Sequence, residues 1–526
     1  MMSTDSNRMT DVTASNYRYF EVHRRLDICP DPLQVYETLF GSSRNGFLLE
    51  SSVVRDGFSR FSFVGDASAP GSEVIRYNLE RKIAHVEDES GVQSVSAPDF
   101  FHFMGERLAS RSVRSSKALP FDFNGGYVGY LGYELKAQAV GTTSFASDEP
   151  AAVQMFSSRL LVIDHQDECT YLLFLAREGD DGSAATAWLD ATSDVLLNLG
   201  EPETQQVSEP ARMSIADVER WITRHARMRH SRDEYIFRIR RALQDIVDGE
   251  TYEVCLTNMI DFVPDFDPIA LYRVLRERSP APHAGFFRAG DLFLLSASPE
   301  RFLSVDRNRR VEAKPIKGTR PRGLAPEEDR MQIEDLLNSE KDRAENLMIV
   351  DLLRNDIGRV CELTSVHVPR LFAIETYSHV HQLVSTIAGT LKADVSTMEC
   401  VRAAFPGGSM TGAPKIRTME IIDRLEGGPR GIYSGVFGWF GLSGACDLSI
   451  VIRSLVVQPG KARFGVGGAL TALSDPQEEF IETMVKARNL IEAMETLKHV
   501  GEGYGAELPR AAARDEEAWS LSVPDW

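Results

Sequence analysis

The chain has 526 residues, of which 43% are hydrophobic and 26% charged, as in globular proteins. That length allows one large domain or two to three ordinary ones. Asp and Glu number 77 against 58 Lys and Arg, and the net charge of −19 argues against non-specific nucleic-acid binding. The six cysteines lack zinc-like spacing, and we find neither a signal peptide nor a membrane-spanning apolar run. We therefore expect a cytoplasmic protein with reduced thiols, in contact with neither nucleic acid nor membrane.

The first part of the chain predicts a disordered N-terminus (residues 1–16) and a β-rich N-terminal domain (17–200). The Gly- and aromatic-rich segment Phe123–Leu135 is predicted to be a turn and a helix entry. Helices are expected at Pro32–Leu39, Ala97–Ser110 and Ala184–Leu199, and strands at Tyr19–His23, Phe47–Ser51, Ser59–Gly65, Glu73–Asn78, Lys82–Val86, Ser158–Asp164 and Thr170–Ala176.

The polar, Pro-flanked segment GEPETQQVSEP marks a linker, taken as residues 201–230. A second domain is expected over 231–498, followed by a loose tail over 499–526. Its predicted elements include a helix opened by a Ser231 and Glu234 capping box. It is followed by a strand at Tyr252–Asp261, a helix at Pro268–Glu277 and a pair of strands at Ala284–Ala289 and Leu292–Ser296. Further along, a β-meander is expected from the strands Ile432–Phe440, Cys446–Val457 and Ala462–Gly467.

A pair of acids lies inside an apolar stripe of a predicted helix near the middle of the chain. Asp342 and Glu345 are three residues apart, so they project from one side of the helix. Buried carboxylates must be paired or must bind a cation. They are either neutralised by Lys341 and Arg343 or form half of a metal site. Upstream, Lys317 is expected on a turn.

The last long helix, Pro476–Leu497, carries a second acid pair. Glu479, Glu482 and Lys486 lie within a 60° arc beside its apolar stripe. Two helices that each offer two acids suit Mg²⁺, which prefers carboxylate oxygens. The alternative is an exposed face of salt bridges, which is the commoner meaning of this spacing.

Several other segments could bind an anionic ligand. The Gly-rich loop before Lys415 opens a helix whose free N–H groups, together with that lysine, could hold an anion or simply form an ordinary cap. Arg453, expected on a middle strand, pairs with an acid or holds a ligand carboxylate. Gly465 to Gly468 allow close backbone approach, and Glu300 places an acid near Lys317. Together these features suggest a pocket for a small dicarboxylate with Mg²⁺.

As a set, the motifs resemble the chorismate-utilising enzymes, a family that includes anthranilate, aminodeoxychorismate, isochorismate and salicylate synthases. The resemblance is dense from about residue 231 to 495 and looser from 17 to 176. It implies an α/β (α+β) fold in which two antiparallel β-sheets pack face to face, flanked by helices. The motifs occur in the family's order: SPERF, PIKGTRPRG, LLRNDIGRV, ETYSHVHQLVSTI, FPGGSMTGAPK, GIYSGVFG, SIVIRSL, FGVGGALTALSDP and EEFIETMVKA.

The resemblance also implies roles for individual residues. Glu345 and Glu482 match the direct Mg²⁺ ligands, Asp342 and Glu479 match acids that hold the metal's waters, and Glu300 matches the general acid beside the C4 hydroxyl. Groups matching those that bind the substrate or line its ring are Thr411, Tyr433, Arg453, Gly465, Gly467, Gly468 and Lys486.

Two positions indicate the reaction within the family. Glu253 stands where isochorismate and salicylate synthases carry a water-activating lysine, and Lys317 stands where anthranilate synthases usually have Ala. The resemblance is therefore to aminodeoxychorismate synthases, whose lysine attacks C2 of chorismate before ammonia attacks C4. Gln382 replaces the His of anthranilate synthases. The expected product is 4-amino-4-deoxychorismate, for 4-aminobenzoate supply to folate or to a secondary metabolite.

Alternatives are anthranilate synthase component I and, much less favoured, a non-catalytic regulatory subunit. No glutaminase motif is present, so ammonia is expected from a separate glutamine amidotransferase subunit. Two segments, Leu48–Ser51 and Ser279–Phe287, match those that bind inhibitory tryptophan in relatives, but Ala281 and His283 disfavour that regulation here.

Overall fold

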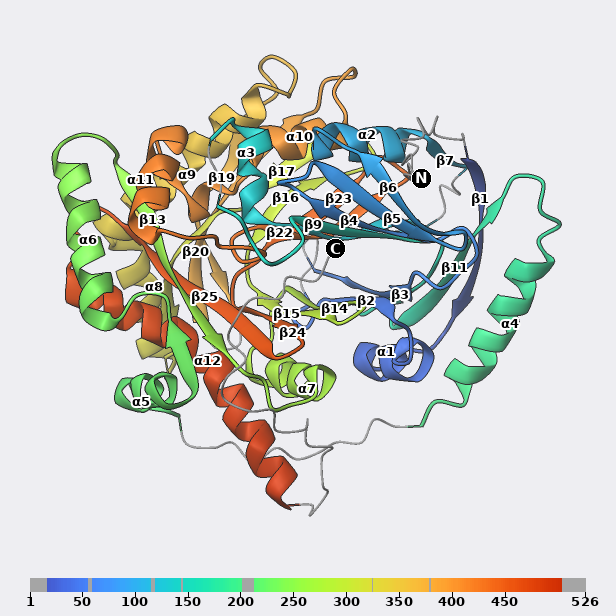
Figure 1. The fold of residues 1–526 in the computed structure, drawn as a ribbon, viewed down its shortest axis with the longest axis horizontal. Helices are drawn as coiled ribbons and strands as arrows, with labels where there is room; N and C mark the ends of the chain where they lie inside the picture. Colours follow the sequence, from blue (N-terminus) through green and yellow to red (C-terminus); the bar gives the residue numbers. More distant parts are fainter. Residues whose placement is uncertain are drawn as a thin grey trace, which may run out of the picture.

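The computed structural model describes residues 17–54, 59–114, 119–142, 145–200, 212–323, 325–377 and 380–503. Two large β-sheets form its centre, with helices on their outer sides (Figure 1). Aromatic side chains of the two sheets meet between them: Phe63 lies 6.1 Å from Trp439, and Phe287 lies 5.8 Å from Phe437, between ring centroids. Such contacts bury large apolar surfaces and hold the sheets face to face. The expected architecture is confirmed.

The first sheet has 13 strands. The described pairings within it are antiparallel, except that β1 runs parallel to β7. The short strand β21 (Gly412–Ala413) pairs with β13 beside the main path. In spatial order the path runs β12 (Ala226–Met228), β13 (Glu253–Phe262), β25 (Lys461–Leu470), β24 (Ser454–Gln458), β15 (Leu292–Ser298), β14 (His283–Ala289), β2 (Asn45–Glu50), β3 (Phe61–Asp66), β10 (Arg159–Asp164), β11 (Cys169–Arg177), β1 (Tyr17–Leu26) and β7 (Arg111–Arg114).

The second sheet has 12 strands, and β19 (His367–Thr376) pairs with β20 beside its main path. That path runs β18 (Ile316–Pro321), β20 (Val380–Thr390), β17 (Arg310–Ala313), β16 (Arg301–Val305), β23 (Cys446–Ile450), β22 (Val436–Gly441), β8 (Gly126–Leu131), β9 (Ala152–Ser157), β4 (Glu73–Asn78), β5 (Ile83–Asp88) and β6 (Gly91–Ser96).

The helices divide between the two sheets. Those that contact the first sheet are α1 (Pro32–Phe40), α4 (Ser183–Leu197), α6 (Arg232–Val247), α7 (Pro268–Arg278), α11 (Lys415–Glu426) and α12 (Pro476–Gly503), with α5 (Ile215–His225) against α12 and β12. Helices α8 (Pro326–Asn338) and α9 (Glu340–Gly358) contact β18 and β20, whereas α10 (Thr397–Ala404) packs on α2 (Phe100–Ala109) and α9. Short helical turns are η1 (Tyr133–Leu135), α3 (Lys136–Ala139) and η2 (Gly408–Met410).

Each sheet joins a block of strands from the N-terminal region (β1–β11) to a block of strands from the C-terminal region (β12–β25). Strand β2 pairs with β14, and β8 pairs with β22, so neighbours in space are separated by hundreds of residues in sequence. The N-terminal region therefore does not stand apart from the C-terminal one. The expected domain boundaries stay a prediction.

Several elements differ from the sequence prediction. Phe123–Leu135, expected as a turn and helix entry, contains the buried strand β8. Its alternating Gly and aromatic residues fit a strand because β22 approaches closely: a Cβ on Gly126 would lie 2.1 Å from the Phe440 carbonyl oxygen. The expected strand Cys446–Val457 is broken at Arg453 (φ 50°), where the chain passes from the second sheet to the first.

Part of the expected linker is folded. Residues 201–211 lie outside the described residues, but α5 and β12 fall within 201–230. The N-cap Ser214 and N3 residue Asp217 form a capping box that opens α5, and its Trp221 donates a hydrogen bond to Glu495 (2.7 Å). Helix α12 continues through residues 499–503, which were expected in the loose tail. Residues 1–16 and 504–526 lie outside the described part. Among the described helices, none has the length and apolarity needed to cross a bilayer.

Candidate active site

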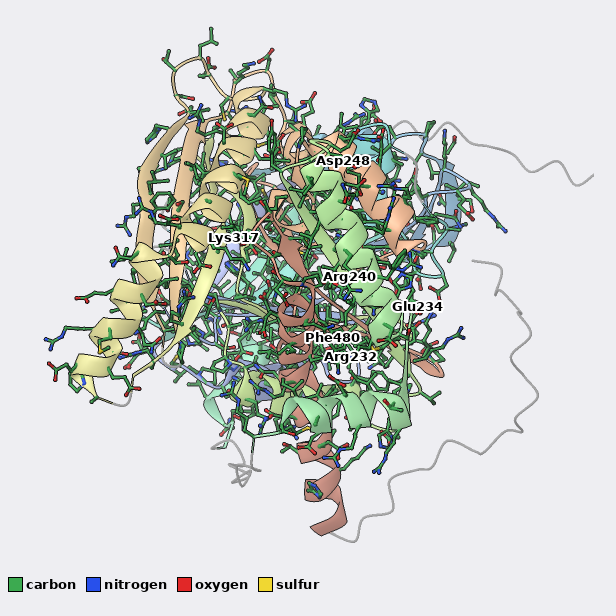
Figure 2. All side chains as sticks on the ribbon, turned by 90° about the vertical axis from the view of Figure 1, so that its left-hand side faces the viewer. Arg232, Glu234, Arg240, Asp248, Lys317 and Phe480 are labelled. Carbon is green, nitrogen blue, oxygen red and sulfur yellow. The ribbon has the colours of Figure 1, made fainter. Side chains whose placement is uncertain are left out.

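Lys317 lies on strand β18 and not on the turn that the sequence predicted. It pairs with Leu383 of β20, and the register shifts between Lys317 and Thr319. Gly318, between them, has φ +76°, a conformation that glycine adopts readily. This irregularity interrupts the regular strand beside the lysine. The side chain of Lys317 is only 9% exposed. Figure 2 views the molecule from the side where α6 lines the surface, with Glu234 and Arg240 on the helix and Asp248 capping its end.

The Lys317 amine is held by a buried carboxylate. Its Nζ donates a 2.6 Å hydrogen bond to Oε1 of Glu253, the first residue of β13. Burial lowers the pKa of Lys317, but the charges of Glu253 and Glu345 outweigh that effect and hold the pKa above its ordinary value. The resting side chain is therefore an ammonium ion. From the sequence, Glu253 served only to exclude water attack at C2. A single carboxylate at the apolar start of a strand was the available sign that this residue would need a cationic partner such as Lys317.

Glu300 supplies a protonatable acid close to this lysine. It lies between β15 and β16 and is 7% exposed. Burial raises its pKa to about 7, although a hydrogen bond with Ser409 and the charge of Lys317 act in the opposite direction. A carboxyl group with this pKa is partly protonated at neutral pH and can donate a proton.

The two helices with acid pairs face each other across Lys341. Its Nζ lies 3.1 Å from Oε1 of Glu479 on α12 and 3.9 Å from Oε1 of Glu345 on α9. Glu345 Oε1 is buried without a hydrogen-bond partner in the described part of the chain. Burial raises the pKa of Glu345 to about 7, partly offset by the charge of Lys317. An under-satisfied carboxylate between facing acidic helices fits a cation site.

The remaining predicted ligands lie around the same region. Lys486 is 2.8 Å from Glu482 Oε1, and a Cβ placed on Gly468 would lie within 3.8 Å of Glu482 and 3.2 Å of Glu479. Asp342 instead forms an ion pair with Arg320 at 3.1 Å. In the described part of the chain no three Asp, Glu, His or Cys side chains lie close enough to hold a metal as they stand. As the side chains stand, Lys341 lies where it offsets the charges of Glu345 and Glu479, which the resemblance assigns to the magnesium site.

Substrate-binding candidates gather around strand β25. Lys486 Nζ donates to the Gly467 carbonyl at 2.7 Å, and the Tyr433 ring packs so closely on Gly465 that a Cβ there would lie 2.2 Å from it. Arg453 has no ion pair with any described residue, and burial lowers its pKa. Of the two sequence alternatives, pairing with an acid is not seen among the described residues, and the ligand-binding role stays a prediction.

The Gly-rich loop is fixed differently from the expectation. Thr411 is fully buried: its hydroxyl donates to the carbonyls of Gly407 and Gly408, and its own carbonyl accepts from Cys255 N–H at 2.8 Å. Lys415 donates to Asp356, at 2.5 Å, and to two carbonyls. Because its three donors are used by Asp356 of α9 and by the carbonyls of Ala404 and Pro406, Lys415 ties the loop to α9 and to the end of α10 and does not face a ligand.

An arginine network that the sequence did not indicate lies beneath these elements. Arg430 is 1% exposed and donates to both Glu426 oxygens and to the carbonyls of Met410 and Cys255. It thereby joins the Gly-rich loop to β13. Glu134 accepts from the N–H groups of Arg430 (2.8 Å) and of the next residue (3.0 Å). The local sequence Gly-Pro-Arg-Gly is typical of a turn and does not predict that Arg430 is buried.

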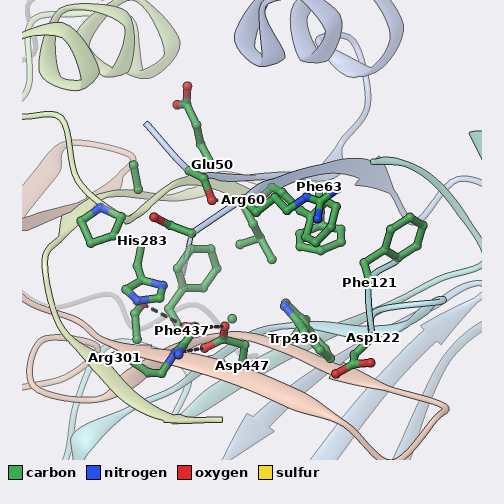
Figure 3. Close-up of a pocket in the computed structure, with 18 of the residues that line it drawn as sticks. Glu50, Arg60, Phe63, Phe121, Asp122, His283, Arg301, Phe437, Trp439 and Asp447 are labelled. Atoms are coloured by element: carbon green, nitrogen blue, oxygen red, sulfur yellow. Dashed lines mark hydrogen bonds and ion pairs between the residues drawn. The ribbon is translucent and has the colours of Figure 1, made fainter. Parts of the chain in front are cut away.

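A separate cavity of about 390 Å³ lies between the two sheets (Figure 3). The segments expected at a tryptophan site contribute Glu50 and His283 to its lining, and the second sheet contributes Arg301 and Trp439. Glu50 is already bound by Arg276, and burial holds the pKa of His283 well below its ordinary value, so the ring is neutral. Regulation by tryptophan, which Ala281 and His283 disfavour in the sequence, stays a prediction that this cavity does not test.

Known proteins similar to this chain agree with the resemblance. Residues 65–492 match the family described as chorismate binding enzyme. The aminodeoxychorismate synthase of Streptomyces griseus is 48% identical over 473 residues, covering 90% of this chain and 64% of that protein. Aminodeoxychorismate synthase component 1 of Klebsiella aerogenes is 33% identical, covering 89% and 97%. The crystal structure of anthranilate synthase component I from Streptococcus pneumoniae TIGR4 superposes with a TM-score of 0.70 at 26% identity, covering 88% and 97%.

This chain spans less than two thirds of the Streptomyces griseus relative's own length. The family match, residues 65–492, contains Lys317, both acid pairs and most strands of the two sheets.

Proposed function

This chain belongs to the family of chorismate binding enzymes, and from that premise we propose that it is the synthase component of an aminodeoxychorismate synthase. It aminates chorismate at C4 to give 4-amino-4-deoxychorismate. The observation that carries this proposal is Lys317, a buried amine beside the acid Glu300. The similarity to aminodeoxychorismate synthases at 48% identity supports it.

Chorismate is a dicarboxylate, and the chain offers cations for it. The half-buried Arg453, without an acid partner among the described residues, binds one carboxylate. Lys486, Tyr433 and the backbone at Gly465, Gly467 and Gly468 surround the same ligand. Thr411, held rigid in its loop, lines the ring.

Magnesium would be held by Glu345 and Glu482, with Asp342 and Glu479 around its waters, and it would offset the charge of a substrate carboxylate. Two features suit these residues to Mg²⁺: the acidic helices α9 and α12 face each other, and Glu345 Oε1 lacks a hydrogen-bond partner among the described residues.

Lys317 and Glu300 divide the chemistry. The Lys317 amine attacks C2 while Glu300 donates a proton to the departing C4 hydroxyl, which leaves as water. Ammonia then attacks C4 and the lysine leaves C2. We place the source of ammonia in a glutamine amidotransferase; the designation of the Klebsiella aerogenes relative as component 1 supports a partner. The unpaired cysteines of the described chain support a reducing compartment such as the cytoplasm.

The product separates this proposal from anthranilate synthesis. Purified protein with chorismate, magnesium and an ammonium salt near pH 8.5 should form 4-amino-4-deoxychorismate, and EDTA should stop it. Anthranilate with pyruvate would contradict the proposal.

Changing Lys317 to Ala tests the nucleophile. The wild-type chain with chorismate and without ammonia should gain the mass of chorismate less water, and the variant should not. We expect amination by the variant to fall at least about 100-fold, the smaller end of what covalent and acid–base groups contribute. An adduct that forms equally well in Lys317→Ala would contradict the assignment.

A further inference from the structure

We infer that Glu253 is the general base that takes the proton from Lys317, so that a neutral amine is released at the moment of attack. This role is distinct from the exclusion of water attack for which the residue was first noted. The inference rests on the proposed function, because it concerns the same lysine.

The geometry of the pair is that of a direct proton transfer. The Lys317 Nζ and Glu253 Oε1 are 2.6 Å apart, within the distance over which a positioned base removes a proton. Glu253 is fully buried, and its second oxygen, Oε2, has no hydrogen-bond partner among the described residues. A carboxylate bound on one side only has an open position for the proton that it receives.

The backbone of Glu253 is fixed from both sides. Residue 253 pairs with Ala413 of β21, and the neighbouring Thr251 hydroxyl donates to the Glu253 carbonyl at 3.0 Å. Cys255, two residues along, donates its N–H to the Thr411 carbonyl. The carboxylate is therefore delivered from a strand that is tied to the substrate-lining loop, which gives it the rigid support that a catalytic group requires.

A base is necessary because the resting amine carries a proton. The other titratable groups whose charges interact with Lys317 include Glu345 on α9, Glu482 on α12, Cys255 on β13 and Glu300 before β16. Glu300 must give a proton to the leaving hydroxyl and so cannot accept one in the same step. Of the described carboxylates, Glu253 is the one that hydrogen-bonds the amine.

The sequence of steps balances. The proton passes from Lys317 to Glu253; the nitrogen lone pair forms the bond to C2, both ring double bonds shift (C1=C2 to C1=C6 and C5=C6 to C4=C5), and the C4–O bond breaks as Glu300 protonates the oxygen. Ammonia next forms the bond to C4, both double bonds shift back, and the C2–N electrons return to Lys317. The new C4 ammonium gives a proton to Glu300, and Glu253 returns its proton to the lysine. The sum is chorismate plus ammonia giving 4-amino-4-deoxychorismate plus water.

The test is Glu253→Gln, which keeps the size of the side chain and an oxygen that can accept from the amine but cannot take its proton. The rate of adduct formation is followed by rapid quenching and intact mass, with chorismate and magnesium saturating and ammonia absent. At pH 6 we expect a loss of roughly 100-fold, within the range that general bases contribute.

The pH profile separates a base from a structural support. In the wild type the proton transfer is internal, so the rate should be level below about pH 7 and fall above it as Glu300 ionises. In Glu253→Gln the amine must lose its proton to solvent, so the rate should rise about tenfold per pH unit below pH 7 and level off above. A variant that is slower by a constant factor at every pH would overturn the inference, as would one with the wild-type rate.

Glu253→Asp is the second variant. If Glu253→Gln does not fold, this variant tests whether Glu253 is the general base. It keeps a carboxylate one methylene further away, so we expect a slower rate with the wild-type profile; a rate that rises with pH below 7 would overturn the inference. Failure of the proposed function looks different: a wild-type chain that aminates chorismate without any lysine adduct overturns both claims, whereas a normal wild-type adduct with an unaffected Glu253→Gln overturns only this one.

Discussion

At the scale of single residues, the site depends on carboxyl groups whose burial changes their protonation. Glu300, buried beside Ser409, has a pKa raised to about 7. An acid of this kind is effective only while it holds its proton. The described environment therefore keeps Glu300 partly protonated at neutral pH, as its proposed role as an acid requires.

Replacing Glu300 with Gln should lower the rate of adduct formation by roughly 100-fold or more, because the amide cannot protonate the leaving hydroxyl. The fall in rate above about pH 7 should disappear in the variant. Rapid-quench mass spectrometry between pH 6 and 9 measures both effects. A variant that retains the decline above pH 7 would assign that decline to another group.

At the scale of elements, the interruption in β18 sets where Lys317 lies. Gly318 has φ +76°, and a Cβ there would lie 2.7 Å from Leu336 and 2.8 Å from Asp342 Cγ. Helices α8 and α9 therefore press directly on the backbone beside the lysine. The sequence showed the Gly but not these neighbours, because contact between a strand and two later helices has no local signature.

Gly318→Ala should destabilise the chain by about 1–3 kcal/mol through backbone strain and should also lower activity more than tenfold by displacing β18 from α9. Gly460→Ala is the matched control: its φ is +72°, but no atom lies within 4 Å of the added Cβ. Gly460→Ala should lose stability through backbone strain but should keep its amination activity. Thermal unfolding and the amination rate, measured on both variants, separate the two effects; equal activities would contradict the role given to Gly318.

What the sequence could predict was local. Capping residues and spacing predicted α6 and α12, and helical periodicity placed each acid pair on one side of its own helix, because periodicity needs no tertiary information. Strand β8 was missed because its Gly-rich pattern gains meaning only from β22. The Lys317 partner Glu253 and the buried Arg430 were missed for the same reason: both contacts join segments far apart in the chain.

At the scale of the whole molecule, Glu134 couples the N-terminal region to the turn that holds Arg430. Burial raises the pKa of Glu134 to about 7, against the backbone hydrogen bonds that lower it. The folded state therefore keeps a proton that the unfolded state loses near pH 4.5, and stability falls as pH rises from about 4.5 to about 7. At full effect this is on the order of 3 kcal/mol.

Glu134→Gln stays neutral throughout that range and should lose this part of the pH dependence. The melting temperature of the wild type minus that of the variant should therefore shrink as pH rises from 5 to 7.5. Differential scanning calorimetry at several pH values, with EDTA present, measures it. A difference that is constant with pH would show that the Glu134 carboxyl is ionised in the folded protein throughout.

Because each sheet joins an N-terminal block of strands to a C-terminal block, the order of synthesis governs when the sheets can be completed. Strand β2 (Asn45–Glu50) must wait for β14 (His283–Ala289), and β8 (Gly126–Leu131) must wait for β22 (Val436–Gly441). While the ribosome is still translating the second half, the first half displays unpaired strand edges that can join those of other nascent chains. Each sheet is thus completed only after its C-terminal block of strands has been translated, and until then the edges of β2 and β8 stay open.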